Sequence, residues 1–207
     1  DVAFSPNGDR SKDRITLVPR TNNEIGITDF TVEILNENGL AVRSFGGRSR
    51  LQSEISWDGL GEDGRIVPEG TYKGLLKINY ANGATVEASS NAFVVDISFP
   101  TAELSSDFKL FSPNGDGQKD KVTFNQSTSQ EESWLGEVFN GQNQKIREFS
   151  WKGVAETFQW DGTDEARNPV PDGLYSYKLS SVDPAGNRTS VDITNLRIDN
   201  RPANAFL

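Results

Sequence analysis

The sequence predicts an all-β protein made of two tandem immunoglobulin-like antiparallel β-sandwich domains. Three observations lead to this fold class: apolar and polar residues alternate in short runs, turn signals recur about every ten residues, and one long block of sequence occurs twice. About seven short strands per hundred residues, with no stretch of helical periodicity, are typical of such a sandwich.

The alternation places apolar side chains on one face of each predicted strand. Ile15 and Leu17 share a face, and Val122 and Phe124 take the same places in a second copy of that run. A period of two residues is the pattern of half-buried antiparallel strands, whereas a helix repeats about every 3.6 residues. We therefore expect strands throughout.

The duplicated block is the most specific signal in the chain. "SWDGLGEDGRIVPEGTY" (Ser56–Tyr72) has a partner in "QWDGTDEARNPVPDGLY" (Gln159–Tyr175), and the same offset continues without a gap as far as Asp96 and Asp199. Repeats of this kind indicate that each copy is one structural unit.

The repeat predicts the domain organisation. Residues 1–99 and 100–200 are expected to form one sandwich each, with a seam near Ser98–Ser105, and residues 201–207 to begin a further repeat. The chain contains no Met, which indicates a mature or excised piece of a larger protein. We therefore expect other domains of that parent protein as its immediate partners.

The duplicated block is expected to close the core of each unit. A Trp ends a strand inside the core, an Asp-Gly pair starts a turn, Pro and Gly form the next bend, and a Tyr enters the following strand with its hydroxyl bonded back to the backbone. These structural residues are Trp57, Asp58, Gly59, Pro68, Gly70 and Tyr72 in the first unit, and Trp160, Asp161, Gly162, Pro171, Gly173 and Tyr175 in the second.

A polar loop opens each unit, reading "FSPNGDRSKD" at Phe4–Asp13 and "FSPNGDGQKD" at Phe111–Asp120. Oxygen-bearing side chains at alternate positions match part of a calcium loop, although Thr123 replaces the Glu that would bind the ion with two oxygens. The alternative is a series of Asx turns that need no metal. A phosphate loop is excluded because a strand follows instead of a helix. The candidate calcium ligands are Asn114, Asp116, Gln118, Asp120, Asn7, Asp9 and Asp13.

Candidate residues for ligand binding and catalysis are few. Trp134 and Trp151 occur only in the second unit and become candidate ligand-stacking residues if both are exposed. Carboxylates cluster in both copies of the block, but in short polar turns where water keeps them ionised. With no His and no Cys, the chain lacks the commonest general base and the thiol nucleophile. We predict no enzyme and no catalytic residue. The clustered carboxylates are Asp58, Glu62, Asp63, Asp161, Asp164 and Glu165.

Charge and hydropathy limit the partners. The net charge of −9 and the isoelectric point near 4.6 argue against nucleic acid and anionic membranes, which bind basic surfaces. No apolar run reaches the length of about 18 residues that a membrane span requires, so no insertion of this segment is expected. The absence of Cys fits an exported protein whose folding does not depend on disulfides.

Two stretches resemble known bacterial families. The Trp160–Leu179 segment resembles the Ig-like domain of the flagellar hook-capping protein, and Phe111–Gly117 is similar to the opening of the gliding-motility-associated C-terminal domains of secreted Bacteroidetes proteins. The resemblance implies a non-catalytic module of an exported protein, located in the periplasm, at the cell surface or outside the cell. It would act as a structural spacer or adhesive domain; the alternative is a carbohydrate- or calcium-dependent module that binds a glycan or surface protein.

Overall fold

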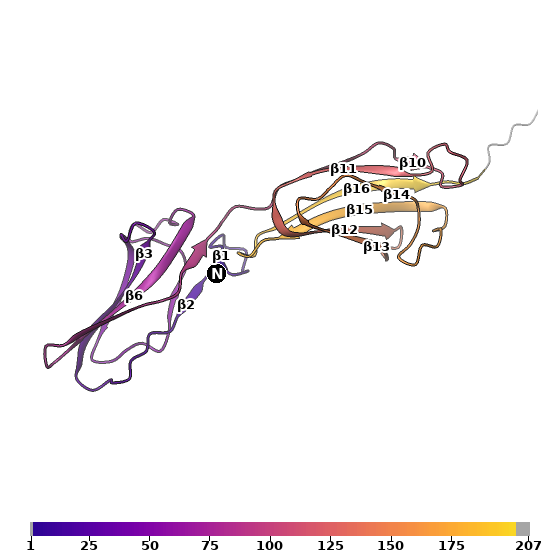
Figure 1. The fold of residues 1–207 in the computed structure, drawn as a ribbon. Helices are drawn as coiled ribbons and strands as arrows, with labels where there is room; N and C mark the ends of the chain where they lie inside the picture. The colour runs from indigo at the N-terminus through magenta and orange to yellow at the C-terminus, as the bar shows by residue number, and fades with distance from the viewer. Residues whose placement is uncertain (1, 202–207) are drawn as a thin grey trace, which may run out of the picture. The chain divides into compact units, whose positions relative to one another are not determined.

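The computed structural model describes residues 2–201, and every regular element in that range is a strand (Figure 1). The chain divides into two compact units: one comprises the residues up to Ser98 together with Pro184–Asn187, and the other comprises Phe99–Asp183 and the residues from Arg188 onward. The expected start of a further repeat at residues 201–207 lies almost wholly outside the described residues. No helix in the described range is long and apolar enough to cross a membrane.

The first unit contains a main sheet and a short second sheet. The main sheet has the order β1-β8-β6-β3-β4, with β7 also paired to β6, and the second sheet consists of β2 and β5. The strands are β1 (Val2–Phe4), β2 (Ile15–Leu17), β3 (Ile27–Asn36), β4 (Ala41–Arg48), β5 (Ile55–Trp57), β6 (Gly70–Tyr80), β7 (Thr85–Ser89) and β8 (Phe93–Val95).

The second unit repeats this plan with a larger second sheet. Its main sheet has the order β10-β16-β15-β12-β13, and the second sheet has the order β14-β11-β9. The strands are β9 (Ala102–Ser106), β10 (Leu110–Phe111), β11 (Val122–Thr128), β12 (Glu131–Asn140), β13 (Lys145–Gly153), β14 (Phe158–Trp160), β15 (Gly173–Val182) and β16 (Arg188–Ile198).

Strand pairing is antiparallel except at one edge of each main sheet. There β1 runs parallel to β8, with Val2 opposite Phe93, and β10 runs parallel to β16, with Leu110 opposite Arg197. Both units are therefore Ig-like sandwiches, as the sequence predicts, with this parallel pair added.

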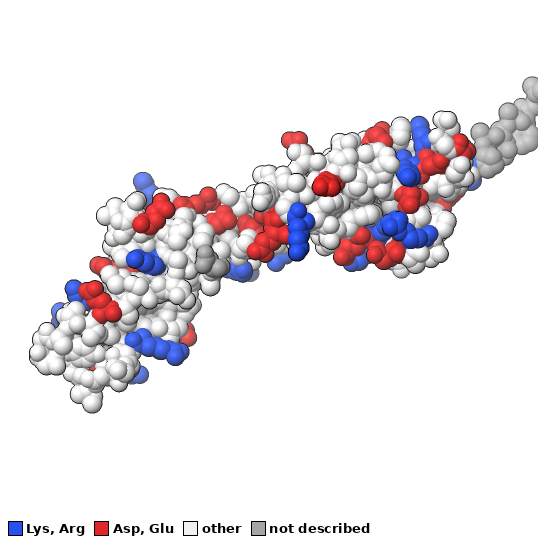
Figure 2. All heavy atoms as spheres, viewed as in Figure 1, with Lys and Arg blue, Asp and Glu red and all other residues white. Residues whose placement is uncertain are grey.

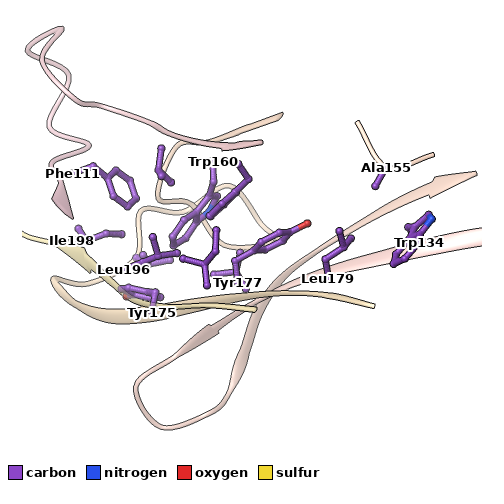
Figure 3. Close-up of a cluster of buried hydrophobic side chains, with 14 residues drawn as sticks. Phe111, Trp134, Ala155, Trp160, Tyr175, Tyr177, Leu179, Leu196 and Ile198 are labelled. Carbon is purple, nitrogen blue, oxygen red and sulfur yellow. The ribbon is translucent and has the colours of Figure 1, made fainter. Parts of the chain in front are cut away.

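The predicted alternation determines which side chains enter the core. Val122 and Phe124 are fully buried, whereas Ile15 and Leu17 at the matching places are only half-buried. In the second unit the buried apolar residues form one continuous cluster, and Figure 3 shows Tyr177 in the middle of it. In the first unit they form two clusters, one around Trp57 and the other around Phe30.

Candidate functional site

In the second unit the duplicated block forms an aromatic group together with Phe111 of β10. Trp160 packs edge-on against Phe111 and Tyr175, with ring centroids 5.6 and 5.5 Å apart (Figure 3). The Trp160 indole donates to the carbonyl of Thr163 at 2.9 Å, and the Tyr175 hydroxyl donates to the carbonyl of Pro171 at 2.7 Å. The indole N–H of Trp160 and the hydroxyl of Tyr175 therefore each keep a hydrogen-bond partner although both rings are buried.

The first unit reproduces this group almost atom for atom. Trp57 lies 5.6 Å from both Phe4 and Tyr72, again edge-on. Its indole donates to the carbonyl of Leu60 at 2.9 Å, and the Tyr72 hydroxyl donates to the carbonyl of Pro68 at 2.7 Å. The geometry matches the structural role predicted for these Trp and Tyr residues.

The opening loop packs directly on the turn that follows each Trp. Gly59 and Gly162 have φ of 75° and 69°, a region that L-residues with a side chain rarely adopt. A Cβ at Gly59 would lie 2.6 Å from Pro6, and one at Gly162 would lie 2.7 Å from Pro113. Both glycines are therefore required by conformation and by contact with the proline of the loop.

Asp120 organises the opening loop of the second unit. Its two carboxylate oxygens accept the backbone N–H groups of Gly115 and Gly117, each at 2.8 Å. Asn114 Oδ1 accepts the N–H of Asp116 at 2.9 Å, as in an Asx turn. The loop is thus closed by its own side chains.

The remaining candidate ligands of that loop also contact the loop itself. Asp116 Oδ1 accepts the N–H of Gln118 at 2.7 Å, while its Oδ2 accepts Asn114 Nδ2 at 3.1 Å. Gln118 donates its backbone N–H in this bond, and its side-chain amide takes no part in it.

The first unit contains the same set of bonds. Asp13 accepts the N–H groups of Gly8 and Arg10, each at 2.8 Å, and Asn7 Oδ1 accepts the N–H of Asp9 at 2.9 Å. Arg10 has φ of 72° at the place where the second unit has a glycine, so this loop keeps its shape despite backbone strain.

These contacts bear on the calcium prediction. The carboxylates of both loops already accept short hydrogen bonds from the backbone, and among the described residues no group of three or more Asp and Glu side chains is arranged to hold a metal ion. The donor set therefore fits a closed Asx-turn loop better than a calcium cage. Calcium binding stays a prediction.

Asp161 is a half-buried carboxylate in the acidic cluster of the second unit. It accepts the Thr163 hydroxyl at 2.6 Å and lies 3.2 Å from the Arg147 guanidinium. Burial raises the pKa of Asp161, but the Thr163 hydrogen bond and the Arg147 charge together outweigh it, so the pKa lies below its usual value. A carboxyl group of this kind is ionised at neutral pH and does not act as a general acid.

Other carboxylates of the two clusters bind backbone groups. Glu62 accepts the N–H of Ser44 at 2.7 Å, and Glu165 accepts the N–H of Glu148 at 3.1 Å. Each glutamate thus ties its turn to the neighbouring strand, β4 or β13. The glutamates of both acidic turns therefore hold the turns against the main sheet.

The two tryptophans proposed as ligand-binding residues differ in burial. Trp134 has no exposed surface, and its indole donates to the carbonyl of Ser129 at 3.0 Å. Trp134 was predicted to bind a ligand only if it and Trp151 are both exposed, and this condition is not met because the Trp134 ring fills the core. Trp151 lies opposite it on β13, half-buried, and packs on Phe149 and Phe158 with ring centroids 6.2 and 5.4 Å away.

Sequence reasoning did not single out Tyr177, the residue at the centre of the second core. Its ring stacks on Phe124 at 4.3 Å, and its hydroxyl donates to the Gln126 side chain at 2.7 Å. The repeat itself contained the signal, because the offset that relates the two blocks maps Gly74 onto Tyr177. A large aromatic residue thus replaces a glycine at equivalent places.

No protein-family model and no curated protein matches the chain. Solved structures similar to it include latent PorU from Porphyromonas gingivalis (14% identity, 88% of this chain and 17% of that chain, TM-score 0.38) and the fibronectin(III)-like modules of CbhA from Clostridium thermocellum (11% identity, 95% and 87%, TM-score 0.45). The hook-capping protein FlgD from Xanthomonas campestris is similar at 17% identity over 57% of this chain and 82% of that chain, with a TM-score of 0.26. These similarities concern the fold and assign no ligand.

Proposed function

We propose that the chain is a non-catalytic tandem Ig-like module of a larger exported bacterial protein, in which it serves as a structural spacer between other domains. The observation that carries the proposal is the duplicated loop and turn. In both units the polar groups of this repeated feature bind their own backbone, and its aromatic rings fill the core. The residues that recur in both units therefore maintain the fold.

The distribution of charge argues against a nucleic-acid partner. On the face shown in Figure 2, basic and acidic side chains are interspersed over each unit. Several of them form exposed ion pairs, such as Lys77 with Glu87 at 3.5 Å and Lys145 with Glu148 at 2.6 Å. A nucleic-acid-binding module would instead gather Lys and Arg on one surface.

Forced unfolding of single molecules tests the spacer function directly. A spacer made of two independent cores is expected to unfold in two separate events. Each event should release about 330–360 Å of extended chain, less the length of the folded unit, because an extended chain spans about 3.3–3.6 Å per residue and each unit has about 100 residues. A single event that releases both units together would contradict the proposal.

Calcium distinguishes the spacer from a calcium-dependent binding module. Because the loop carboxylates are occupied by backbone N–H groups, we expect the same melting temperature with calcium and with a chelator. The Asp116→Ala variant serves as the control, and it should be insensitive to calcium as well. If calcium raises the melting temperature of the wild type and Asp116→Ala abolishes that shift, the loop is a calcium site.

A further inference from the structure

The main sheet of the second unit ends at β13, which lies at the rim of the sandwich beside β12 (Figure 1). β13 pairs only with β12, so within residues 2–201 its other edge has no partner strand. The matching strand of the first unit, β4, ends its own sheet in the same way. This edge is therefore left unpaired by the repeated unit itself. An unpaired edge presents N–H and C=O groups that can bind another extended chain.

The acidic turn of the second unit covers one half of this edge. Glu165 accepts the N–H of Glu148 at 3.1 Å, and its own N–H donates to the carbonyl of Ile146 at 3.2 Å. Alternate residues of a strand direct their backbone groups to opposite sides. The backbone groups of Ser150 and Lys152 therefore face away from β12 as well, but beyond the reach of the turn.

The other half of the edge carries apolar side chains. Trp151 is half-buried, and its ring centroid lies 5.4 Å from that of Phe158, which is half-buried as well. Val154, directly after the strand, is 49% exposed. A strand added here would remove apolar surface from water, which stabilises a contact. We call Ser150–Lys152 the free edge.

The matching edge of the first unit differs in one aromatic residue. Gly47 takes the place of Trp151, since the two residues lie opposite Phe30 and Trp134 respectively. A Cβ at Gly47 would lie 2.6 Å from the Phe30 ring, so a side chain at this position would displace that ring. The edge of the first unit therefore offers backbone groups without the tryptophan beside them.

We propose that the free edge pairs with the free edge of a second copy of this chain, antiparallel and about a twofold axis at Trp151. In this register Ser150 of one copy lies opposite Lys152 of the other, and each donates to and accepts from the backbone of the other. Trp151 faces its counterpart in a non-hydrogen-bonded pair, where cross-strand side chains come closest. The inference goes beyond the spacer function and does not depend on it.

The charges along β13 favour a copy of the same chain as the partner. Glu148, Ser150 and Lys152 are exposed and lie on one face of the strand. In the twofold register Lys152 lies diagonally across from Glu148 of the second copy, within reach of a long side chain. The symmetry repeats this contact, so each copy supplies one positive and one negative charge. A lysine on an edge normally opposes strand pairing, and the diagonal carboxylate offsets that effect.

The ends of the free edge limit the size of the contact. Gly153 has φ of 81° and ends β13, and at the other end the turn of Glu165 occupies the edge. Pairing therefore extends over a few residues only. Because interfaces smaller than about 1,200 Å² belong to weak complexes, we expect a weak dimer.

Sedimentation and hydrogen exchange test the proposal on the full chain. Sedimentation equilibrium at up to about 1 mM protein should show monomers and dimers. The amides of Ser150 and Lys152 face solvent in the monomer, so their exchange monitored by NMR should slow to about half its rate when half of the chains are paired. The amides of Gly46 and Arg48, on the matching edge of the first unit, should exchange at a rate that does not depend on concentration.

A proline at the free edge removes the donor on which the pairing depends. Ser150→Pro removes an N–H that faces away from β12, and proline is tolerated at such positions of an edge strand. The variant should therefore fold and remain monomeric. Ser150→Ala is the matched control, because it keeps the N–H and should dimerise as the wild type does.

Charge reversal tests the same register without altering the backbone. Lys152→Glu places like charges diagonally across the axis and should weaken the dimer by about threefold or more. Adding Glu148→Lys to the same chain should restore it, because each pair then has opposite charges again. The proposal is overturned if the chain stays monomeric at about 1 mM, if charge reversal or Ser150→Pro leaves the dimer unchanged, or if the edges of both units are protected alike.

Discussion

The two units have the same aromatic group around the duplicated turn and differ in the middle of the core. The group of Phe, Trp and Tyr around the duplicated turn has the same ring distances in both units to within 0.1 Å. Between that group and the far end of the core, the second unit has Tyr177 where the first has Gly74. Gly136 and Val32 take equivalent places in the sheets, since they lie opposite Leu179 and Leu76 respectively. One core is therefore continuous, and the other is divided into two clusters.

The difference shows how a large side chain is accommodated in a sandwich. A Cβ at Gly136 would collide with the Tyr177 hydroxyl and would lie 2.8 Å from the Trp151 ring. The tyrosine thus requires a glycine on the adjacent strand. In the first unit Val32 and Gly74 take these places, and a cavity of about 150 Å³ remains beside them. The valine therefore only partly replaces the volume of the tyrosine ring.

The largest expected effect comes from removing the residue that joins the second core. Tyr177→Gly should destabilise the second unit by about 3–5 kcal/mol, since a fully buried aromatic ring is replaced by a cavity. Hydrogen exchange, measured by mass spectrometry on peptides of each unit, would show the loss there and leave the first unit unchanged. An equal loss of protection in both units would mean that the cores are not independent.

The duplicated turn should respond alike in the two units. Gly59→Ala and Gly162→Ala each force a Cβ into a left-handed conformation and against a proline, at a cost of about 2–3 kcal/mol. Urea unfolding of the two variants would measure both costs. If only one of the two substitutions lowers the free energy of unfolding, the two turns are not equivalent, despite their matching distances.

Raising the pH should cause a smaller and reversible loss of stability in the second unit. Burial raises the pKa of Tyr177 far above its unfolded value of about 10. The stability that depends on the neutral phenol is therefore fully present below about pH 10, and it is lost above that by about 1.4 kcal/mol per pH unit as the unfolded chain ionises.

The Tyr177→Phe variant isolates this contribution. Burial also raises the pKa of Tyr72 and of Tyr175, but these residues occur once in each unit and so do not distinguish the two. Urea unfolding at about pH 9 and about pH 11 should show a steeper loss for the wild type than for the variant. Equal losses would mean that Tyr177 ionises as readily in the folded protein as in the unfolded chain.

The fold class and the structural residues of the block were predictable because they rest on local signals. Trp57 and Trp160 end strands of alternating pattern, and Gly59 and Gly162 follow an Asp in turns that require positive φ. Trp134 shows the opposite case. Its sequence context does not reveal whether the ring faces the core or the solvent, because both faces of β12 carry large residues.

By itself the sequence determined that strands form, that they form twice, and that each copy closes around its own Trp and Tyr, because periodicity, turn chemistry and duplication are properties of neighbouring residues. Only the tertiary structure decided that the loop carboxylates bind their own backbone and that Tyr177 fills the space left by Gly136. Those outcomes depend on which groups meet across the sandwich, and they are governed by packing and hydrogen bonding between residues distant in the chain.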